Sequence, residues 1–344
     1  MRTTILWICV LLGAAPVMAQ SPGEVSPPEV EAPVDEIVVT GEFPGPGLWK
    51  ITRADDASHV MWIIGEPPPL PKRMQWKSKD VEAVALSAQE ILRDSSVSLE
   101  PDEKIGFFRA MTLLPAVLAA RRNPDDAKLK DLVPPDLYAR WLVQKKLYLG
   151  YEIGAESWRP LYAAFKLGKA AFDELDLRTG DVVWDVIGDL AKKHKIKVTN
   201  PRLNFTFKRD EVRTKLKELS RESLSDVVCF DTTLQLVEAL GDRKTQNARA
   251  HAWAIGDHEG LAQLPVLPSP TLPCALAVMN SQVARDMFPA DLREQVHALW
   301  LEAAEKSLTT NTTTFAIVPF VKLTRPDGYL AKLRAKGYLI EAPK

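Results

Sequence analysis

The sequence predicts an α/β fold in which N-terminal and C-terminal β-α-β units build a central mixed sheet, with a large helical region between them. Compact apolar runs typical of buried strands occur near both ends of the chain, at 61–64 and 313–320. The residues from 104 to about 190 follow the spacing of amphipathic helices. Because the sequence contains no repeat of fixed period, we expect one domain over 47–344.

The N-terminal unit is expected to open with a β-hairpin. One strand covers 47–51, a turn passes through 55–57, and a second strand runs over 59–64. The second strand stops at Gly65-Glu66, and a run of prolines that includes Pro68 follows. Functional groups in α/β folds often lie just past such a strand end, so this is the first candidate region for a site.

A helix and a third strand complete the N-terminal unit. Apolar residues at helical spacing predict one helix that carries residues from Val81 to Leu92 on one face. The stretch 95–100, SSVSLE, then predicts a short strand that ends in the carboxylate of Glu100.

The middle of the chain is expected to be mainly helical, and the C-terminal unit returns to β-α-β order. Breaks at 123–125, 134–135 and Gly154 divide the first helices, and strand character is expected at 198–207. Later elements are expected as helices at 227–240, 250–255 and 292–303, a strand at 313–320, a helix at 327–336 that ends at Gly337, and a strand at 338–340.

The first residues resemble a secretory signal peptide. Arg2 precedes an apolar core over 5–12, and small residues at Val17 and Ala19 fit a cleavage site, so residues 1–19 are expected to be removed before Gln20. An uncleaved anchor is the alternative, although this core is too short to span a bilayer. No later segment is apolar enough to cross a membrane, and the mature protein is therefore expected to be exported, as a periplasmic or secreted protein.

Residues 20–46 form a Pro/Glu-rich linker that is not expected to fold alone. Within it, Asp35–Gly41 (DEIVVTG) resembles a short segment near the N-terminus of TonB-dependent outer-membrane receptors. Such a run can add as a strand to a partner's sheet, which would link the protein to TonB-type machinery. It can equally form an edge strand of the protein's own sheet, which the general frequency of such runs favours.

Net charge and cysteine content indicate which partners and which covalent bonds to expect. The chain has 44 basic and 45 acidic residues, a formal net charge of −1, so nothing indicates nucleic acid as a partner. Cys9 leaves with the signal peptide, and Cys229 and Cys274 remain in a compartment where disulfides persist. They are expected to form a bridge, with two separate buried thiols as the alternative.

Several motifs, taken in order, resemble the TraB/GumN family, which is grouped with the TIKI metalloproteases. The resemblance covers residues from about 48 to 340 and depends on the order and spacing of the motifs rather than on any one of them. The motifs are LWK at 48–50, the strand into Gly65, LP at 70–71, Trp76, WRP at 158–160, AWAIGD at 252–257 and LAKLRAKGY at 330–338.

The resemblance implies a metal hydrolase, but this chain departs from the family at the ligand positions. Active members carry two Gly-x-x-His motifs and an acidic residue at a strand end, which would hold a metal that activates water. The first motif falls on Gly65-Glu66-Pro67-Pro68 and the second on Pro319 to Lys322, so Pro68 and Lys322 replace the histidines. Only the acidic residue is kept, and the resemblance places it at Glu100.

We therefore expect a degenerate site made of Gly65, Glu66, Pro68, Glu100 and Lys322, with no metal and no cofactor. A buried carboxylate that has lost a metal needs another positive charge, so one hypothesis pairs Lys322 with Glu100 or Glu66. The alternative is that Lys322 points to solvent.

Three functions remain open from the sequence. The first is a non-catalytic exported protein that uses the old cleft or the acidic N-terminal segment to bind an envelope protein or a small ligand. The second is a metal-dependent hydrolase or peptidase that acts through non-standard residues. The third is an envelope assembly or export component that engages TonB-type machinery through Asp35–Gly41.

Overall fold

The computed structural model describes residues 45–343 except 68, 153 and 179, and these residues belong to one compact unit. The predictions for the signal peptide, for the linker up to residue 44, for Asp35–Gly41 and for Pro68 fall outside the described residues and stay predictions. Among the described residues, no helix has the length and apolar character needed to span a bilayer.

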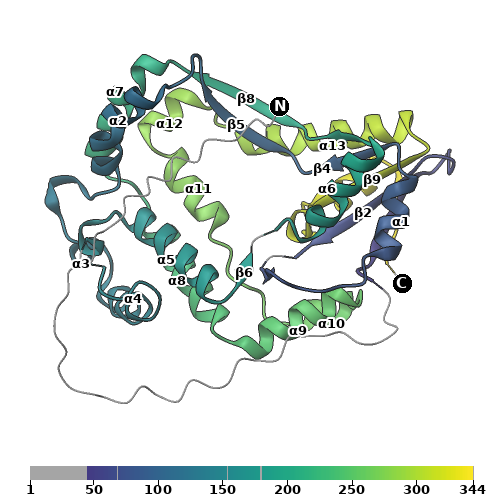
Figure 1. Cartoon of the computed structure of the whole chain (residues 1–344), viewed down its shortest axis with the longest axis horizontal. Helices are drawn as coiled ribbons and strands as arrows, with labels where there is room; N and C mark the ends of the chain where they lie inside the picture. The colour runs from purple at the N-terminus through teal and green to yellow at the C-terminus, as the bar shows by residue number, and fades with distance from the viewer. Residues whose placement is uncertain (1–44, 68, 153, 179, 344) are drawn as a thin grey trace. The chain divides into compact units, whose positions relative to one another are not determined.

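The centre of the structure is a six-stranded mixed sheet in the order β10-β1-β2-β9-β4-β7 (Figure 1). Strands β2, β9, β4 and β7 run parallel to one another, whereas β1 is antiparallel to both β2 and β10. The strands are β1 Leu48–Arg53, β2 Val60–Glu66, β4 Glu90–Arg93, β7 Lys197–Thr199, β9 Thr313–Pro319 and β10 Tyr338–Glu341. The predicted mixed α/β class with a central mixed sheet is confirmed.

Helices cover both faces of this sheet because its central strands are apolar on both sides. Ile64 of β2 packs in a cluster with residues of α1, α6, α9 and α10, whereas Met61 and Ile63 pack with residues of α13 and α15. These helices are α1 Lys79–Ser87, α6 Val182–His194, α9 Arg243–Ala254, α10 His258–Gln263, α13 Leu292–Thr310 and α15 Tyr329–Ala335. Two-sided burial is the usual state of parallel strands, and it explains why β2 reads as a continuous apolar run.

The helix predicted from Val81 to Leu92 is wrong in its second half. Helix α1 ends at Ser87, and 90–93 form strand β4 between β7 and β9. Ile91 and Leu92 therefore face opposite sides of the sheet and join different core clusters. Two adjacent apolar residues fit a helical face and a two-sided strand equally well, so local periodicity alone did not separate the two.

The strand predicted at 95–100 exists but does not belong to the central sheet. It is β5 Ser96–Pro101, which pairs in parallel with β8 Arg202–Phe207 in a separate two-stranded sheet. The strand expected over 198–207 is likewise divided between β7 and β8. A further two-stranded sheet joins β3 Leu70–Pro71 to β6 Leu177–Arg178.

The helical middle has its own core and one disulfide. Cys229 of α8 and Cys274 of α11 are bridged, which confirms the expected pair. The bridge closes a loop of 45 residues, and a loop of this size is worth about 4 kcal/mol in the chain-entropy description. Remaining helices are α2 Phe107–Ala120, α3 Leu129–Leu132, α4 Pro135–Tyr148, α5 Pro160–Glu174, α7 Val212–Arg221, α8 Val227–Leu240, α11 Thr271–Met279, α12 Gln282–Met287 and α14 Phe320–Thr324, with 3-10 turns η1 Pro124–Asp126, η2 Ala155–Ser157 and η3 Arg209–Glu211.

Candidate functional site

The candidate site lies at the carboxyl edge of the parallel strands β2, β9 and β4. The two stretches aligned with the family motifs meet there, because Gly65 is paired with Val318 and Glu66 with Pro319 across β2 and β9. Strand β4 pairs with β9 on its other side and ends at Arg93. Groups more than two hundred residues apart in sequence are thus brought together only by the folded sheet.

Gly65 is required by the close approach of α14 to this edge. A Cβ atom at Gly65 would lie 2.9 Å from the Phe320 ring, which is shorter than a normal contact. The Gly65 carbonyl accepts a hydrogen bond of 2.9 Å from Nε1 of Trp253, which lies on α9. The glycine of the first motif therefore has a structural role in this chain, because a larger residue would clash with α14.

Glu66 is buried and caps the start of helix α6. Its Oε1 accepts a hydrogen bond of 2.8 Å from the Val183 amide, and its Oε2 accepts one of 3.2 Å from the Asp181 amide. Burial raises the pKa of Glu66, and these two amide bonds oppose that shift. Both oxygens are thus engaged by main-chain donors that a helix N-terminus would otherwise leave unsatisfied.

Lys322 forms an ion pair with Asp94 directly beyond the end of β4. The Lys322 Nζ atom lies 2.6 Å from Oδ2 of Asp94, and the Tyr329 hydroxyl donates a hydrogen bond of 2.9 Å to Oδ1 of the same carboxylate. Lys322 comes from α14 and Tyr329 from α15, so both donors reach Asp94 from the chain that follows β9. Both oxygens of Asp94 are therefore occupied by donors of this chain.

His297 of α13 lies next to Tyr329, close to the Lys322–Asp94 ion pair. Its ring lies 4.3 Å from the Tyr329 ring between centroids, and its Nδ1 is a buried atom without a hydrogen-bond partner among the described residues. Burial lowers the pKa of His297, and the nearby Lys332 and Lys322 lower it further. Burial likewise raises the pKa of the Tyr329 hydroxyl, and the Asp94 carboxylate adds to the shift. Both shifts favour the neutral forms of these side chains.

The hypothesis that Lys322 pairs with Glu100 or Glu66 is wrong. Among the described residues, Lys322 has Asp94 as its ion-pair partner, and Glu66 is engaged by main-chain amides. Glu100 is exposed on β5, where its carboxylate accepts a hydrogen bond of 2.9 Å from Ser98. The carboxylate at the edge of the central sheet is Asp94, because β4 and not β5 is the strand that adjoins β9.

The donor set at this edge does not fit the divalent metal that the family resemblance implies. Divalent metals require deprotonated, unengaged lone pairs on carboxylate or imidazole groups. Here both oxygens of Asp94 accept from Lys322 and Tyr329, and both oxygens of Glu66 accept from main-chain amides. The Lys322 ammonium also repels a cation. Nowhere in the described part of the chain do three or more His, Cys, Asp or Glu side chains gather in a way that would hold a metal ion.

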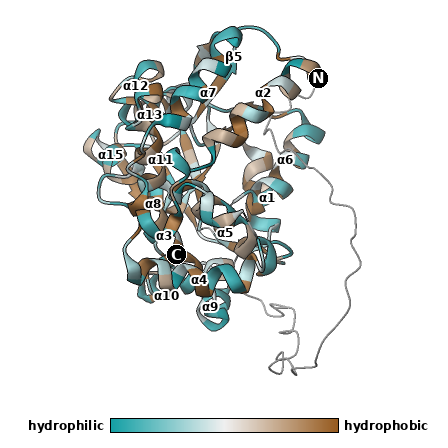
Figure 2. Cartoon of the chain, turned by 90° about the vertical axis from the view of Figure 1, so that its left-hand side faces the viewer, coloured by the Kyte–Doolittle hydropathy of each residue, from teal (hydrophilic) through white to brown (hydrophobic). Residues whose placement is uncertain are grey.

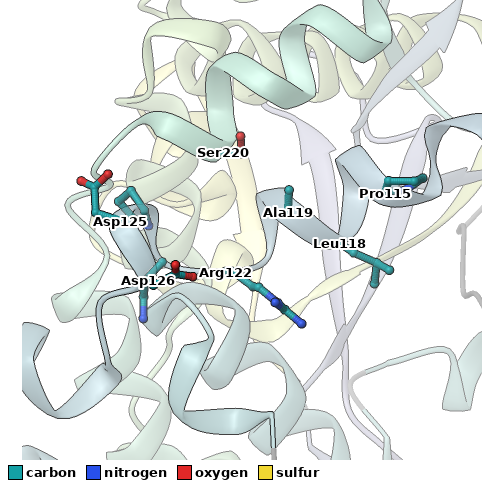
Figure 3. Close-up of a pocket in the computed structure, with 9 residues that line it drawn as sticks. Pro115, Leu118, Ala119, Arg122, Asp125, Asp126 and Ser220 are labelled. Carbon is teal, nitrogen blue, oxygen red and sulfur yellow. The ribbon is translucent and has the colours of Figure 1, made fainter.

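A surface hollow of about 490 Å³ lies elsewhere, between the end of α2, the 3-10 turn η1 and α7. Its lining includes Leu118, Arg122, Asp125, Asp126 and Ser220 (Figure 3). No predicted site residue lines this hollow. It is therefore separate from the carboxyl edge.

Fold and site together describe an α/β protein with an ion pair at the carboxyl edge of its parallel strands. The chain belongs to the TraB/PrgY/gumN family, since the model of that family matches residues 47–342, which is most of the chain. The predicted resemblance is thus confirmed. Neither the search of curated proteins nor the search of solved structures gave a match.

Proposed function

We propose that this protein is an exported, non-catalytic member of its family that uses the carboxyl edge of the sheet to bind an envelope protein or a small ligand. The observation that carries the proposal is the ion pair between Lys322 and Asp94. An ammonium group bonded to the carboxylate provides a positive charge where a hydrolase would need a metal. The carboxyl edge still brings the two aligned motif stretches together, and an internal salt bridge takes the place of the metal.

Partial exposure of the ion pair supports a binding role. The Lys322 side chain is 38% exposed and that of Asp94 is 20% exposed, so solvent and ligands reach both. Tyr329, by contrast, is fully buried, and its hydroxyl donates a hydrogen bond to the Asp94 carboxylate. A partly exposed charge pair at a strand edge is able to exchange its internal partner for polar groups of a ligand.

The catalytic alternative is tested by looking for hydrolysis that depends on Asp94. Purified wild type and Asp94→Asn are incubated with mixed fluorogenic peptides in the presence of zinc, manganese or cobalt ions. We expect no hydrolysis that distinguishes the two proteins. Metal-stimulated cleavage by the wild type that disappears in Asp94→Asn, but not in a control Asp55→Asn on the exposed hairpin turn, would identify a working hydrolase.

The binding role is tested by a thermal-shift screen of small polar ligands against wild type and Lys322→Met. We expect at least one ligand to raise the melting temperature of the wild type and to leave that of Lys322→Met unchanged. If every stabilising ligand acts equally on both proteins, the carboxyl edge is not the binding site.

Export is tested by the N-terminus of the protein recovered from fractionated cells. Processing is expected to give a periplasmic or secreted form that begins at Gln20. A protein that retains Met1 and stays in the cytoplasm would refute this part of the proposal. For the TonB-type alternative, deletion of residues 35–41 that leaves every envelope pull-down unchanged would count against it.

A further inference from the structure

Helix α2 carries an exposed apolar surface that the rest of the described chain leaves uncovered. We call it the α2 patch, and its members are Phe107, Phe108, Met111 and Leu118, which are 75%, 85%, 52% and 44% exposed. The two phenylalanine rings lie 5.7 Å apart between centroids and contact each other edge to face. Figure 2 shows hydrophobic colouring along much of α2. Adjacent exposed aromatic residues of this kind are typical of interaction surfaces.

Basic residues of α2 and α7 lie beside the α2 patch. The segment 104–122 contains Lys104, Arg109, Arg121 and Arg122 and no acidic residue, and acidic residues flank this segment at 102–103 and 125–126. The neighbouring helix α7 adds further basic groups and a single acid, Glu218; its basic residues are Arg213, Lys215, Lys217 and Arg221. Basic side chains of two helices therefore adjoin the apolar α2 patch.

Two contacts place the basic helix beside the α2 patch. The Arg213 guanidinium of α7 donates a hydrogen bond of 2.5 Å to the Thr112 carbonyl of α2, which is adjacent in sequence to Met111. Arg109, the neighbour of Phe108, forms an ion pair with Asp210 of η3, at the start of α7. Four nearby side chains have no ion-pair partner within the described part of the chain, namely Lys104, Arg122, Lys217 and Arg221.

We propose that the α2 patch docks on an anionic phospholipid surface. The Phe107 and Phe108 rings and Met111 would enter the boundary between headgroups and acyl chains, while the basic residues of α2 and α7 remain at the level of the negatively charged headgroups. A membrane surface offers an apolar interior and an anionic rim together, and this combination matches the patch. Helix α2 has 14 residues, too few to span a bilayer, so the contact is superficial.

This inference does not depend on the function proposed for the carboxyl edge. The α2 patch and the basic residues beside it lie on α2 and α7, whereas Asp94 directly follows β4 and Lys322 lies on α14. Loss of membrane docking would leave the Lys322–Asp94 ion pair unchanged. Loss of the ion pair would likewise leave membrane docking unchanged.

The test is flotation with lipid vesicles, one set of phosphatidylcholine alone and one of phosphatidylcholine mixed with phosphatidylglycerol. All proteins lack residues 1–19, because that apolar segment would bind vesicles by itself, and the residues that the structure describes begin only at 45. The variant is Phe107→Ser with Phe108→Ser, and the matched control is Val143→Ser with Leu147→Ser on α4, where the two side chains are 62% and 65% exposed. A second variant, Arg122→Glu with Lys217→Glu, reverses charge and keeps the rings.

We expect the wild type and the α4 control to float with the anionic vesicles and to bind the neutral ones weakly. The double serine variant should bind at least about tenfold less, since burial of even one phenylalanine is worth more than the corresponding free energy. The charge-reversed variant should lose only the preference for anionic vesicles, and added salt should weaken wild-type binding.

Three results would overturn the proposal. They are absence of wild-type binding, equal binding by the wild type and the double serine variant, and an equal loss in the α4 control. A wild type that is dimeric by light scattering, becomes monomeric in the double serine variant and ignores vesicles would assign the α2 patch to a second copy of this chain instead. Because the rings are exposed, unchanged circular dichroism of the variant confirms that the fold is retained.

Discussion

The two ends of strand β4 each hold a carboxylate, and the two carboxylates are satisfied in different ways. Glu90, at the amino end, is 3% exposed. It accepts hydrogen bonds of 3.0 Å from Ser307 and 2.7 Å from Asn311, a further one from Thr199, and it pairs with Lys197 at 2.9 Å. Burial raises the pKa of Glu90, but these donors outweigh burial and hold the pKa below its ordinary value.

Asp94, at the carboxyl end, relies on fewer donors and remains partly open to solvent. Its side chain is bonded by one ammonium, from Lys322, and by one phenol, from Tyr329. Burial of a carboxylate in this protein therefore does not by itself indicate a ligand-binding site. The enclosed carboxylate of Glu90 stabilises the fold, whereas the Asp94 carboxylate, which is 20% exposed at the carboxyl edge, is the one that a ligand is able to reach.

The largest expected effect comes from removing the enclosed carboxylate. Glu90→Ala would leave the buried donors of Ser307, Thr199 and Asn311 without an acceptor, so the free energy of unfolding should fall by about 3 kcal/mol. Urea denaturation measures this change. Glu341→Ala, which removes a 60% exposed partner of Lys50, is the control and should change stability by less than about 0.5 kcal/mol. A loss below about 1 kcal/mol for Glu90→Ala would show that the network is not important for stability.

The pH dependence of stability should separate Glu90 from Glu66. Because the folded pKa of Glu90 is lowered, its stabilising contribution is present above the ordinary carboxyl pKa and is lost as the pH falls through the lowered value. Because the folded pKa of Glu66 is raised, the unfolded chain ionises first as the pH rises, and stability is lost in that direction.

These opposite signs are measurable with two glutamine variants. As the pH rises from about 2.5 to about 4.3, the advantage of the wild type over Glu90→Gln should grow, whereas as the pH rises from about 4.3 to about 7 its advantage over Glu66→Gln should shrink. Urea unfolding across this range provides the comparison. Curves that move in the same direction for both variants would contradict the assignment.

A smaller effect is expected from the ion pair itself. In a double-mutant cycle of Lys322→Met and Asp94→Asn, the coupling free energy should be about 0.5–1 kcal/mol, because Lys322 is 38% exposed and water screens the pair. Added salt should reduce this coupling. A value indistinguishable from zero at low salt would mean that the contact is incidental.

The strands and the sheet class were predictable from the sequence because apolar runs report burial directly. The run at 61–64 gave the central strand β2, and the run at 313–320 gave β9, whose pairing with β2 aligns Gly65 with Val318. The disulfide was also expected, since Cys229 and Cys274 are the cysteines left after the predicted cleavage.

The acidic member of the site was not predictable in the same way. Strand β4 is four residues long and follows α1 after a short connection, so the sequence pattern predicts Ile91 and Leu92 as the end of a helix. The family resemblance therefore places the acidic residue at Glu100, at the end of the strand predicted over 95–100. Only the pairing of β4 with β9 shows that Asp94 adjoins Lys322.

Metal content tests most directly whether an ion pair stands where a hydrolase would hold its metal. Wild type and Asp94→Asn are purified without chelator and analysed for zinc, manganese and cobalt by mass spectrometry. We predict far less than one equivalent of any metal in either protein, because Lys322 and Tyr329 already occupy the oxygens of Asp94. About one equivalent per chain in the wild type, lost in Asp94→Asn, would contradict the proposal.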